Sequence, residues 1–384
     1  MPVNIACIGG GLRFEALSDV IRLMPDRFRV VAVCEPDAHR SALAAQRWPE
    51  ARIVSDVEAL LPADEIDAAL VLTPDFSHSS VATTLLRHRI SVFIDKPLAT
   101  SIKEADEILR ASLSSGALVY VGHNMRFMPV IEEMKKLIDS GAIGRPLTFW
   151  IRHFIGRGGD YFFKDWHACN TLTGGLLIHK ASHDLDALAY MTGAQFTAVS
   201  AIASRQVYHQ CERRDPSLPQ PPIVQSVDHW PPRSQRDIHP YADAYDSAIM
   251  SLQCVGGMIG TYMQCHFTPD YWRNFCIIGD AGRIENFGDS SGNGDIRVWN
   301  QRRAGYDAQP DVVVPLGTDP LDGRTHDGAD QRMLEDFYLS LTTHQQPRTN
   351  VMDARMCIAA GELALKSIDT GGHYDLAYPP ELKQ

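Results

Sequence analysis

The chain has 384 residues, of which 45% are hydrophobic and 22% are charged, a balance that is ordinary for a globular protein. This length exceeds the size at which one hydrophobic core usually stops growing, so we expect two domains. The 36 basic residues are outnumbered by 47 acidic ones, which gives a formal net charge of −11. Because general nucleic-acid binders neutralise phosphates with clustered lysine and arginine, this charge argues against a nucleic-acid partner.

The eight cysteines are scattered, without a Cys-x-x-Cys pair or the regular spacing of a disulfide framework. This pattern is typical of reduced, mostly buried thiols in a cytosolic protein. The opening segment MPVNIACIGGG enters a strand pattern almost at once, so we expect no signal segment. No apolar run approaches the roughly 18 residues that a membrane-spanning helix needs. We therefore predict a cytoplasmic protein with no membrane partner.

The first 120 residues alternate short, β-rich apolar runs with segments of helical periodicity. The runs NIACIG, RVVAVCE, AALVLT, ISVFID and ALVYVGH have the composition of strands that are buried on both faces. The segments between them repeat apolar residues at helical spacing. This alternation predicts βαβ units and a parallel sheet, and we assign residues 1–123 to a first, α/β domain.

The pattern changes after the helix predicted within RFMPVIEEMKKLIDSGAIGRP. From about residue 147 long strand-like runs dominate, and CVGG and GDAG mark hairpin turns within them. Residues 124–384 are therefore expected to form an α+β domain with a large, mainly antiparallel open sheet. Within it, residues 211–240 are rich in proline, arginine and aspartate and lack periodicity, which predicts a long irregular excursion that serves as an active-site lid or an interface arm.

The segment IACIGGGLRFEAL is the first candidate site. Gly9 and Gly11 follow the first predicted strand and precede a helix, where a tight turn and the helix N-terminus hold a pyrophosphate. The motif is imperfect, because Phe14 occupies the place of the third glycine. Glu35 ends the second predicted strand, where a carboxylate binds the two adenosine-ribose hydroxyls and repels a 2′-phosphate. These features predict an NAD site rather than an NADP site.

Two further segments carry residues suited to chemistry. In ISVFIDKPLATS, Lys96 follows Asp95 at the end of a predicted strand, which places it at the ligand-binding edge of a parallel sheet rather than in an ordinary surface turn. In GGLLIHKASHDLD, His179 and His183 are four residues apart and would share one helix face. They suit catalysis, a zinc pair or a structural role. Because the glutamate of a His-Glu-x-x-His motif is absent and no third ligand is required by spacing, we favour catalysis and predict no metal.

The motifs IGGG, TPDFSH, DKPLA, GHNMRFMP and GGLLIHKASHDLD, together with Glu35, follow one another in a characteristic order. In this order and at these spacings they resemble the glucose-fructose oxidoreductase, inositol dehydrogenase and MocA (Gfo/Idh/MocA) family, and the resemblance covers nearly the whole chain. It implies an N-terminal Rossmann domain and a C-terminal domain whose sheet forms a homodimer or homotetramer through its outer face. The family acts on many sugars and polyols, so the resemblance implies a small carbohydrate substrate without identifying it.

The resemblance also implies roles for individual residues. DKP matches the Glu-Lys-Pro of the family, so Lys96 would lie near both the nicotinamide and the substrate hydroxyl, and His183 matches the catalytic histidine. The candidate cofactor-binding residues are Gly9, Gly11, Leu12, Arg13, Glu35, Arg40, Thr73, Pro74, His78, Asp95, Lys96 and Asn124. The candidate substrate-binding residues are Lys96, Arg152, Arg157, Lys164, Trp166, His179, Lys180, His183 and His326.

His179 is the main departure from the family, whose simple dehydrogenases commonly carry aspartate there. The change should make the substrate pocket more cationic, which favours a substrate with an anionic group. It also suits an additional acid–base step, as in relatives that are NAD-dependent glycosidases and cleave a bond through transient oxidation, elimination and re-reduction. A non-catalytic dinucleotide-binding regulator is the third alternative, but such proteins are expected to lose the lysine or the histidine. The primary prediction is therefore an NAD-dependent oxidoreductase that uses Lys96 and His183 on a secondary hydroxyl.

Overall fold

A computed structural model describes residues 2–61, 65–318 and 325–378, and the chain separates into two compact units. Unit 1 consists of Met1–Phe127 and Gly323–Ile358, and unit 2 of Met128–Asp322 and Ala359–Gln384. All eight cysteines lie in the described ranges, where they are buried and carry free thiols. No helix in these ranges is both long and apolar enough to cross a membrane.

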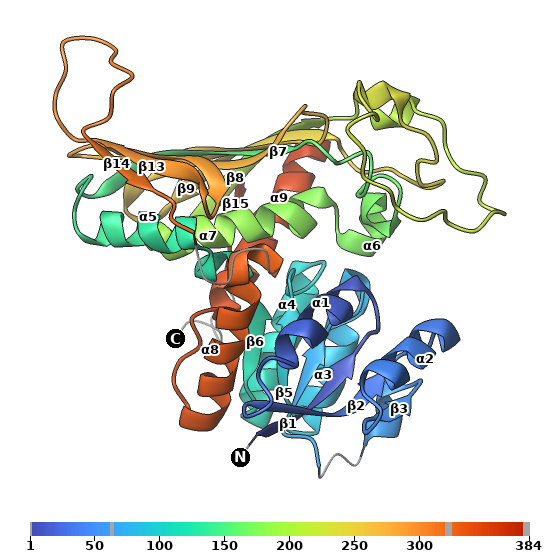
Figure 1. Ribbon diagram of the computed structural model, residues 1–384. Helices are drawn as coiled ribbons and strands as arrows, with labels where there is room; N and C mark the ends of the chain where they lie inside the picture. The colour runs from blue at the N-terminus through green and yellow to red at the C-terminus, as the bar shows by residue number, and fades with distance from the viewer. Residues whose placement is uncertain (1, 62–64, 319–324, 379–384) are drawn as a thin grey trace. The chain divides into compact units, whose positions relative to one another are not determined.

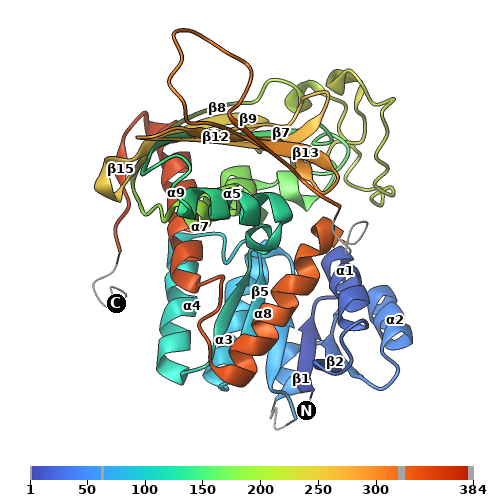
Figure 2. The same cartoon turned by 60° about the vertical axis from the view of Figure 1, so that its left-hand side comes forward.

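Unit 1 is a six-stranded parallel sheet in the order β3-β2-β1-β4-β5-β6, with helices on both faces (Figure 1). Figure 2 shows α3 and α4 on one side of the sheet and α1 and α2 on the other. The elements are β1 (Val3–Ile8), α1 (Leu12–Ile21), β2 (Phe28–Cys34), α2 (Ala38–Arg47), β3 (Arg52–Val54), β4 (Ala68–Val71), α3 (His78–Arg87), β5 (Ser91–Asp95), α4 (Ile102–Ser115), β6 (Val119–Gly122), α8 (Ala329–Thr343) and the first part of α9 (Val351–Thr370). The predicted α/β Rossmann architecture is confirmed.

The helix α8 shows why the domain boundaries differ from the predicted ones. We expected everything after residue 123 to belong to the second domain, but residues 323–358 return to unit 1. Phe337 on α8 is fully buried, and its ring centroid lies 5.6 Å from that of Phe93 and 5.3 Å from that of Tyr120, both on sheet strands. These contacts join segments more than 200 residues apart, and the order of elements along the chain does not reveal them.

Unit 2 is built on a nine-stranded sheet in the order β14-β13-β12-β11-β7-β10-β9-β8-β15, with α5 and α7 on one face (Figure 1). Only β7 and β10 pair in parallel, so the expected mainly antiparallel sheet is confirmed. Its elements are α5 (Pro129–Asp139), β7 (Pro146–Ile155), α6 (Asn170–Thr173), α7 (Ser182–Thr192), β8 (Phe196–Ser204), β9 (Ser247–Cys254), β10 (Ile259–Cys265), β11 (Tyr271–Gly279), β12 (Arg283–Ser290), β13 (Asn293–Trp299), β14 (Val312–Pro315), β15 (Tyr374–Asp375) and the rest of α9.

Residues 211–240 are all described and form an irregular segment that we call the excursion. It contains one short 3-10 turn, Pro232–Ser234, and a single bridge between Arg213 and Ile238. Its two ends are held by a core cluster that includes Cys211 and Ile238. The excursion therefore has fixed anchor points although it contains almost no regular secondary structure.

A buried carboxylate attaches α7 to the sheet of unit 2. Asp184 is fully buried and accepts hydrogen bonds from His153 Nδ1 at 2.8 Å, Tyr262 Oη at 2.9 Å and Arg273 Nε at 2.9 Å. Three neighbouring strands, β7, β10 and β11, supply these donors. Burial acts to raise the pKa of Asp184, but His153 and Arg273 outweigh it and lower the pKa to about 2. The network fixes α7, which carries His183 one residue before Asp184.

His153 makes the stability of this network depend on pH. Burial lowers the pKa of His153 from 6.5 to about 4, against the opposing effect of Asp184, so the imidazole stays neutral in the folded protein. In the unfolded chain His153 takes up a proton near its ordinary pKa of 6.5, whereas in the folded chain it does so only near pH 4. The free energy of unfolding should therefore fall as the pH drops between these values, by up to about 3 kcal/mol from this group.

We predict that His153→Asn flattens this pH dependence, because asparagine keeps an N–H donor for Asp184 but does not titrate. Urea unfolding at several pH values between 7 and 4 measures the effect, with the exposed His209→Asn as the matched control. Equal pH slopes for wild type and His153→Asn would contradict the prediction.

Candidate functional site

The turn after β1 has the geometry of a phosphate cradle. Gly9 has a φ of +101°, and a Cβ atom on it would lie only 2.7 Å from the carbonyl oxygen of Leu72. Gly11 is the extended N-cap of α1, and no side chain caps this helix end. The first N–H groups of a helix have no partner within the helix, so they are available to an anion. The turn therefore fits the pyrophosphate of a dinucleotide.

Glu35 lies directly beside this turn. Its side chain is 6% exposed, and Oε2 accepts a hydrogen bond from the Gly10 N–H at 2.5 Å while Oε1 accepts one from the Asp37 N–H at 2.8 Å. These two bonds hold the carboxylate at the end of β2. The carboxylate therefore lies next to the glycine turn, as predicted from the sequence.

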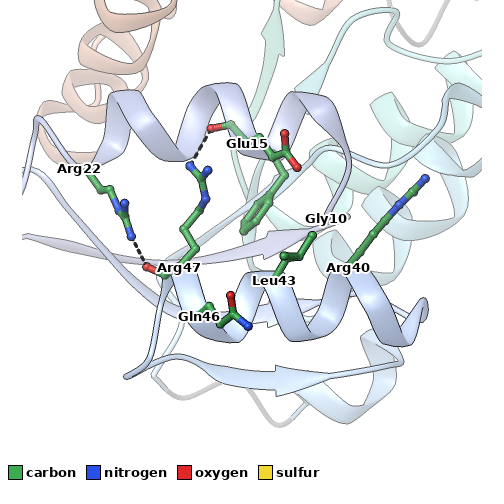
Figure 3. Close-up of a pocket in the computed structure, with 8 residues that line it drawn as sticks. Gly10, Glu15, Arg22, Arg40, Leu43, Gln46 and Arg47 are labelled. Atoms are coloured by element: carbon green, nitrogen blue, oxygen red, sulfur yellow. Dashed lines mark hydrogen bonds between the residues drawn. The ribbon is translucent and has the colours of Figure 1, made fainter. Parts of the chain in front are cut away.

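A cavity of about 300 Å³ lies between α1 and α2 next to the glycine turn (Figure 3). Gly10 and Arg40 line one end, and Arg47, which donates a hydrogen bond to the Glu15 carbonyl oxygen at 3.2 Å, lies further along the helices. Leu12, at the start of α1, is 65% exposed. Arg40, one of the predicted cofactor-binding residues, therefore lines a cavity that adjoins the glycine turn.

Asp330, which was not predicted as a site residue, binds the side chains of three predicted residues. It accepts two hydrogen bonds from the Arg13 guanidinium at 2.8 Å each, one from Asn124 Nδ2 at 2.9 Å and one from His326 Nδ1 at 3.0 Å. Arg13 Nε also donates to Asp95 Oδ1 at 2.9 Å. Burial acts to raise the pKa of Asp330, but Arg13 and His326 hold it well below its usual range. The network joins the start of α1, the end of β5 and the start of α8.

Lys96 follows β5 and lies close to a second buried acid. Burial raises the pKa of Asp75 to about 7, against the opposing effects of His78 and Lys96. The ring nitrogens of His78 lie 2.8 Å from the Pro97 carbonyl oxygen and 2.9 Å from that of Thr73. His78 was predicted to lie along the cofactor. Its ring lies between carbonyl oxygens of the loops after β4 and β5, the second of which carries Lys96.

Two predicted cofactor residues have buried oxygens that no described group satisfies. Thr73 Oγ1 and Asn124 Oδ1 are inaccessible to solvent and have no hydrogen-bond partner within residues 2–61, 65–318 and 325–378. Buried polar atoms are almost always paired in native proteins, so such atoms at a candidate site favour a bound ligand. Together with the glycine turn and Glu35, they fit a nicotinamide dinucleotide, for which Pro74, between Thr73 and Asp75, would supply apolar contact.

In unit 2 the two predicted catalytic histidines lie in a helix that is not uniformly α-helical. Leu177–Ala181 is a π-helical turn that contains His179, and α7 begins at Ser182, so that His183 is in its first turn. Both histidines are buried. The pair therefore spans a π-helical turn and the start of an α-helix rather than one uniform α-helix. Within the described ranges no group of three or more His, Cys, Asp or Glu side chains is arranged to hold a metal ion.

His179 lies in an aromatic cluster. Its ring centroid is 5.0 Å from that of His167, 6.1 Å from that of Trp166 and 6.1 Å from that of Phe162. Trp166 in turn stacks on His167 at 4.1 Å. The predicted residues Trp166 and His179 are thus brought together, and the ring of His167 lies between them.

Arg152, predicted to bind substrate, lies on the wrong face of the sheet for contact with α7. His153 points toward Asp184 on α7, and because side chains alternate along a strand, Arg152 points to the opposite face. There its guanidinium donates to Asn274 Oδ1 at 2.8 Å and to Glu285 Oε1 at 3.1 Å. We therefore withdraw Arg152 from the substrate site.

A cavity of about 870 Å³ in unit 2 contains two other predicted substrate residues, Arg157 and Lys180. Asp160 and Asp270 also line it, so the charge of its lining is mixed. Lys96, His179 and His183, around which a cationic substrate pocket was predicted, are not part of this lining, so that expectation stays a prediction. Lys164 belongs to the same loop as Arg157 but is not part of the lining.

The chain matches two sequence models of one family. Residues 3–123 match an oxidoreductase family with an NAD-binding Rossmann fold, and residues 131–285 match the GFO/IDH/MocA C-terminal domain. Similar curated proteins include inositol 2-dehydrogenase 2 of Saccharopolyspora erythraea, 31% identical over 209 residues, which are 54% of this chain and 58% of that protein. Another is 2,7-anhydro-N-acetylneuraminate hydratase of Mediterraneibacter gnavus, 27% identical over 212 residues, which are 55% of this chain and 54% of that protein. The chain thus spans little more than half the length of these relatives.

Solved structures extend the likeness of fold to the whole chain. Levoglucosan dehydrogenase in complex with NADH and levoglucosan superposes with a TM-score of 0.79 over 98% of this chain and 99% of that one, at 20% identity. At this identity the match concerns the fold alone, whereas the two sequence models together cover most of the chain. The chain belongs to the Gfo/Idh/MocA family of oxidoreductases with an NAD-binding Rossmann fold.

Proposed function

We propose that this protein is an NAD-dependent oxidoreductase that acts on a secondary hydroxyl of a sugar, sugar acid or polyol. One observation carries the proposal: the carboxyl ends of the strands in unit 1 present a glycine turn, the Glu35 carboxylate and Lys96, together with the buried oxygens of Thr73 and Asn124 that lack a described partner. The names of relatives support a carbohydrate substrate, because several are inositol dehydrogenases and one fold neighbour was solved with levoglucosan.

In this proposal Lys96 and His183 act on the same hydroxyl. NAD supplies the hydride acceptor when it is bound. Lys96, in its charged form, stabilises the negative charge that develops on the oxygen, and a ring nitrogen of His183 accepts the hydroxyl proton. The Asp184 network holds the first turn of α7 and thereby orients His183.

A second candidate is the redox-assisted cleavage of a glycoside. His179 favours it, because a buried second histidine four residues before His183 can serve the extra proton transfer that elimination beside an oxidised carbon requires. A relative named as a hydratase supports chemistry beyond plain oxidation. Such a reaction forms no net NADH.

We further propose that NAD is preferred over NADP, since the Glu35 carboxylate beside the ribose site would repel a 2′-phosphate. The outer face of the unit 2 sheet is proposed to form a homodimer or homotetramer. Ile202, Ile249 and Ile259 on that face are 71%, 40% and 56% exposed in the single chain, which suits burial against a second copy. Sedimentation equilibrium would show a monomer if this assignment were wrong.

The function is tested by incubating the purified protein with NAD and sugars, sugar acids, sulfonated or phosphorylated sugars, inositols and glycosides in D₂O. NADH absorbance reports oxidation, and NMR reports cleavage and deuterium at the carbon beside the oxidised one. Stoichiometric NADH supports the dehydrogenase, and cleavage with deuterium but no net NADH supports the second candidate. If NAD binds but no compound is turned over, the protein is a dinucleotide-binding regulator.

On the best substrate we predict that Lys96→Ala and His183→Gln each lower kcat by a factor of about 10² to 10⁴, the range for loss of a positioned acid–base or electrostatic group. Stopped-flow or steady-state NADH formation measures the loss. The exposed Lys103→Ala is the matched control and should retain wild-type activity. Full activity of Lys96→Ala would show that the site assignment is wrong.

We also predict that Glu35→Gln lowers the preference for NAD over NADP, expressed as the ratio of their kcat/KM values, by at least about tenfold, because it removes the repelling charge and keeps the side-chain size. The exposed Glu50→Gln serves as control for a general change in net charge. An unchanged ratio in Glu35→Gln would place the ribose contact elsewhere.

A further inference from the structure

The cavity of about 870 Å³ in unit 2 is larger than one sugar ring needs. Cavities of roughly 300 to 1,000 Å³ enclose ligands of drug size, which have two or three times the atoms of a monosaccharide. Three segments form its walls: the loop that follows β7, the loop before β11, and Gln225–Trp230 of the excursion. Lys180, which follows His179 and precedes His183, also lines it. The cavity therefore adjoins the segment that carries the proposed catalytic histidine.

The wall contributed by the excursion is held in place by a buried acid. Asp160, 3% exposed, accepts hydrogen bonds from His229 Nδ1 at 2.5 Å, Gln235 Nε2 at 2.8 Å and the Ser226 N–H at 3.2 Å. Because all three donors belong to the excursion, one carboxylate attaches the segment at three points. This side of the cavity is therefore formed by a segment that is held by buried hydrogen bonds rather than by a loose surface loop.

Close packing of backbone reinforces this wall. In the segment GRGGD, a Cβ on Gly159 would lie 2.5 Å from the Tyr208 ring and 2.8 Å from Gln235 Cγ, so only glycine fits. Arg157, in the same segment, donates to Gln225 Oε1 at 2.6 Å. The loop after β7 and the excursion consequently form one surface toward the cavity.

The chemistry of the lining suits an uncharged, polyhydroxylated ring. Trp230 and Tyr271 are each 48% exposed, and half-exposed aromatic rings at a concave surface offer flat apolar faces to a ligand. A sugar presents C–H groups on its faces and hydroxyls, which both donate and accept, around its rim. Arg157 and Lys180 provide donors and Asp270 provides an acceptor. With carboxylates balancing the cations, the lining lacks the excess positive charge that a phosphate or nucleotide group would require.

We propose that this cavity binds a second sugar ring of the substrate, so that the protein acts on a disaccharide or an aryl glycoside in preference to a free monosaccharide or inositol. The assignment rests on the proposed function, since it concerns the same substrate. It names Trp230 as a residue that determines specificity through stacking with the second ring.

The test compares matched pairs: glucose, galactose, mannose and glucuronate against their α- and β-linked para-nitrophenyl glycosides and glucose-terminated disaccharides. Calorimetric titration of the NAD-loaded protein gives the Kd of each compound, and turnover gives kcat/KM where it occurs. We expect at least one two-ring compound to bind at least tenfold more tightly than its one-ring partner. Trp230→Ala should reduce this ratio to near one, and Trp230→Phe, which keeps an aromatic face, should retain most of it.

Two further variants make the result decisive if Trp230→Ala folds poorly. Tyr271→Ala removes the half-exposed ring contributed by a different element and should also lower the ratio. Tyr306→Ala, whose ring is 92% exposed and does not line the cavity, should leave it unchanged.

The possible failures are distinguishable. If no two-ring compound binds tenfold more tightly than its partner, or if Trp230→Ala and Tyr271→Ala leave the ratio unchanged, the second-ring site is wrong even when monosaccharides are oxidised. If two-ring compounds bind through Trp230 but none is oxidised or cleaved, the binding site stands and the proposed function is wrong.

Discussion

A carboxylate removed from water must be surrounded by hydrogen-bond donors, and this constraint organises every part of the candidate site. In unit 1 Asp330 draws Arg13, Asn124 and His326 together. In unit 2 Asp184 ties three strands to α7. Asp160 does the same for the excursion. Each acid joins segments that are distant in sequence, because the acid and its hydrogen-bond donors come from different parts of the chain.

The three buried acids support different parts of the candidate site. None of the three is proposed to touch the reacting atoms. Asp184 holds the helix that carries His183, Asp330 holds predicted cofactor- and substrate-binding residues, and Asp160 holds the excursion. The proposed reactive groups, Lys96 and His183, lie in backbone that is itself constrained, one after a strand whose loop is held by His78 and the other in the first turn of a helix held through Asp184. The π-helical turn before that helix carries His179 and Lys180, which both adjoin the ring of Phe162, and Lys180 also lines the large cavity.

Much of the fold was predictable from the chain alone, because periodicity and glycine placement report local backbone geometry. The parallel sheet of unit 1, the glycine turn and the position of Glu35 follow from such patterns. The return of α8 to unit 1 was not predictable, since Phe337 packs on strands more than 200 residues earlier. The placement of Arg152 was not predictable for a related reason: strand alternation assigns it to one of two faces, but only the packing of α7 shows that Arg152 points away from the helix that carries His183.

The sequence by itself determined the family, the dinucleotide turn and the candidate reactive residues, because these depend on residue type and spacing along short segments. Only the tertiary structure decided which acids are buried, that the excursion walls a cavity, and that cations and carboxylates both line this cavity. The physical reason is that the burial of a side chain and the net charge of a cavity lining depend on residues that are distant in the sequence. Asp160 and Asp184 look like ordinary surface acids in the sequence until the groups that enclose them are known.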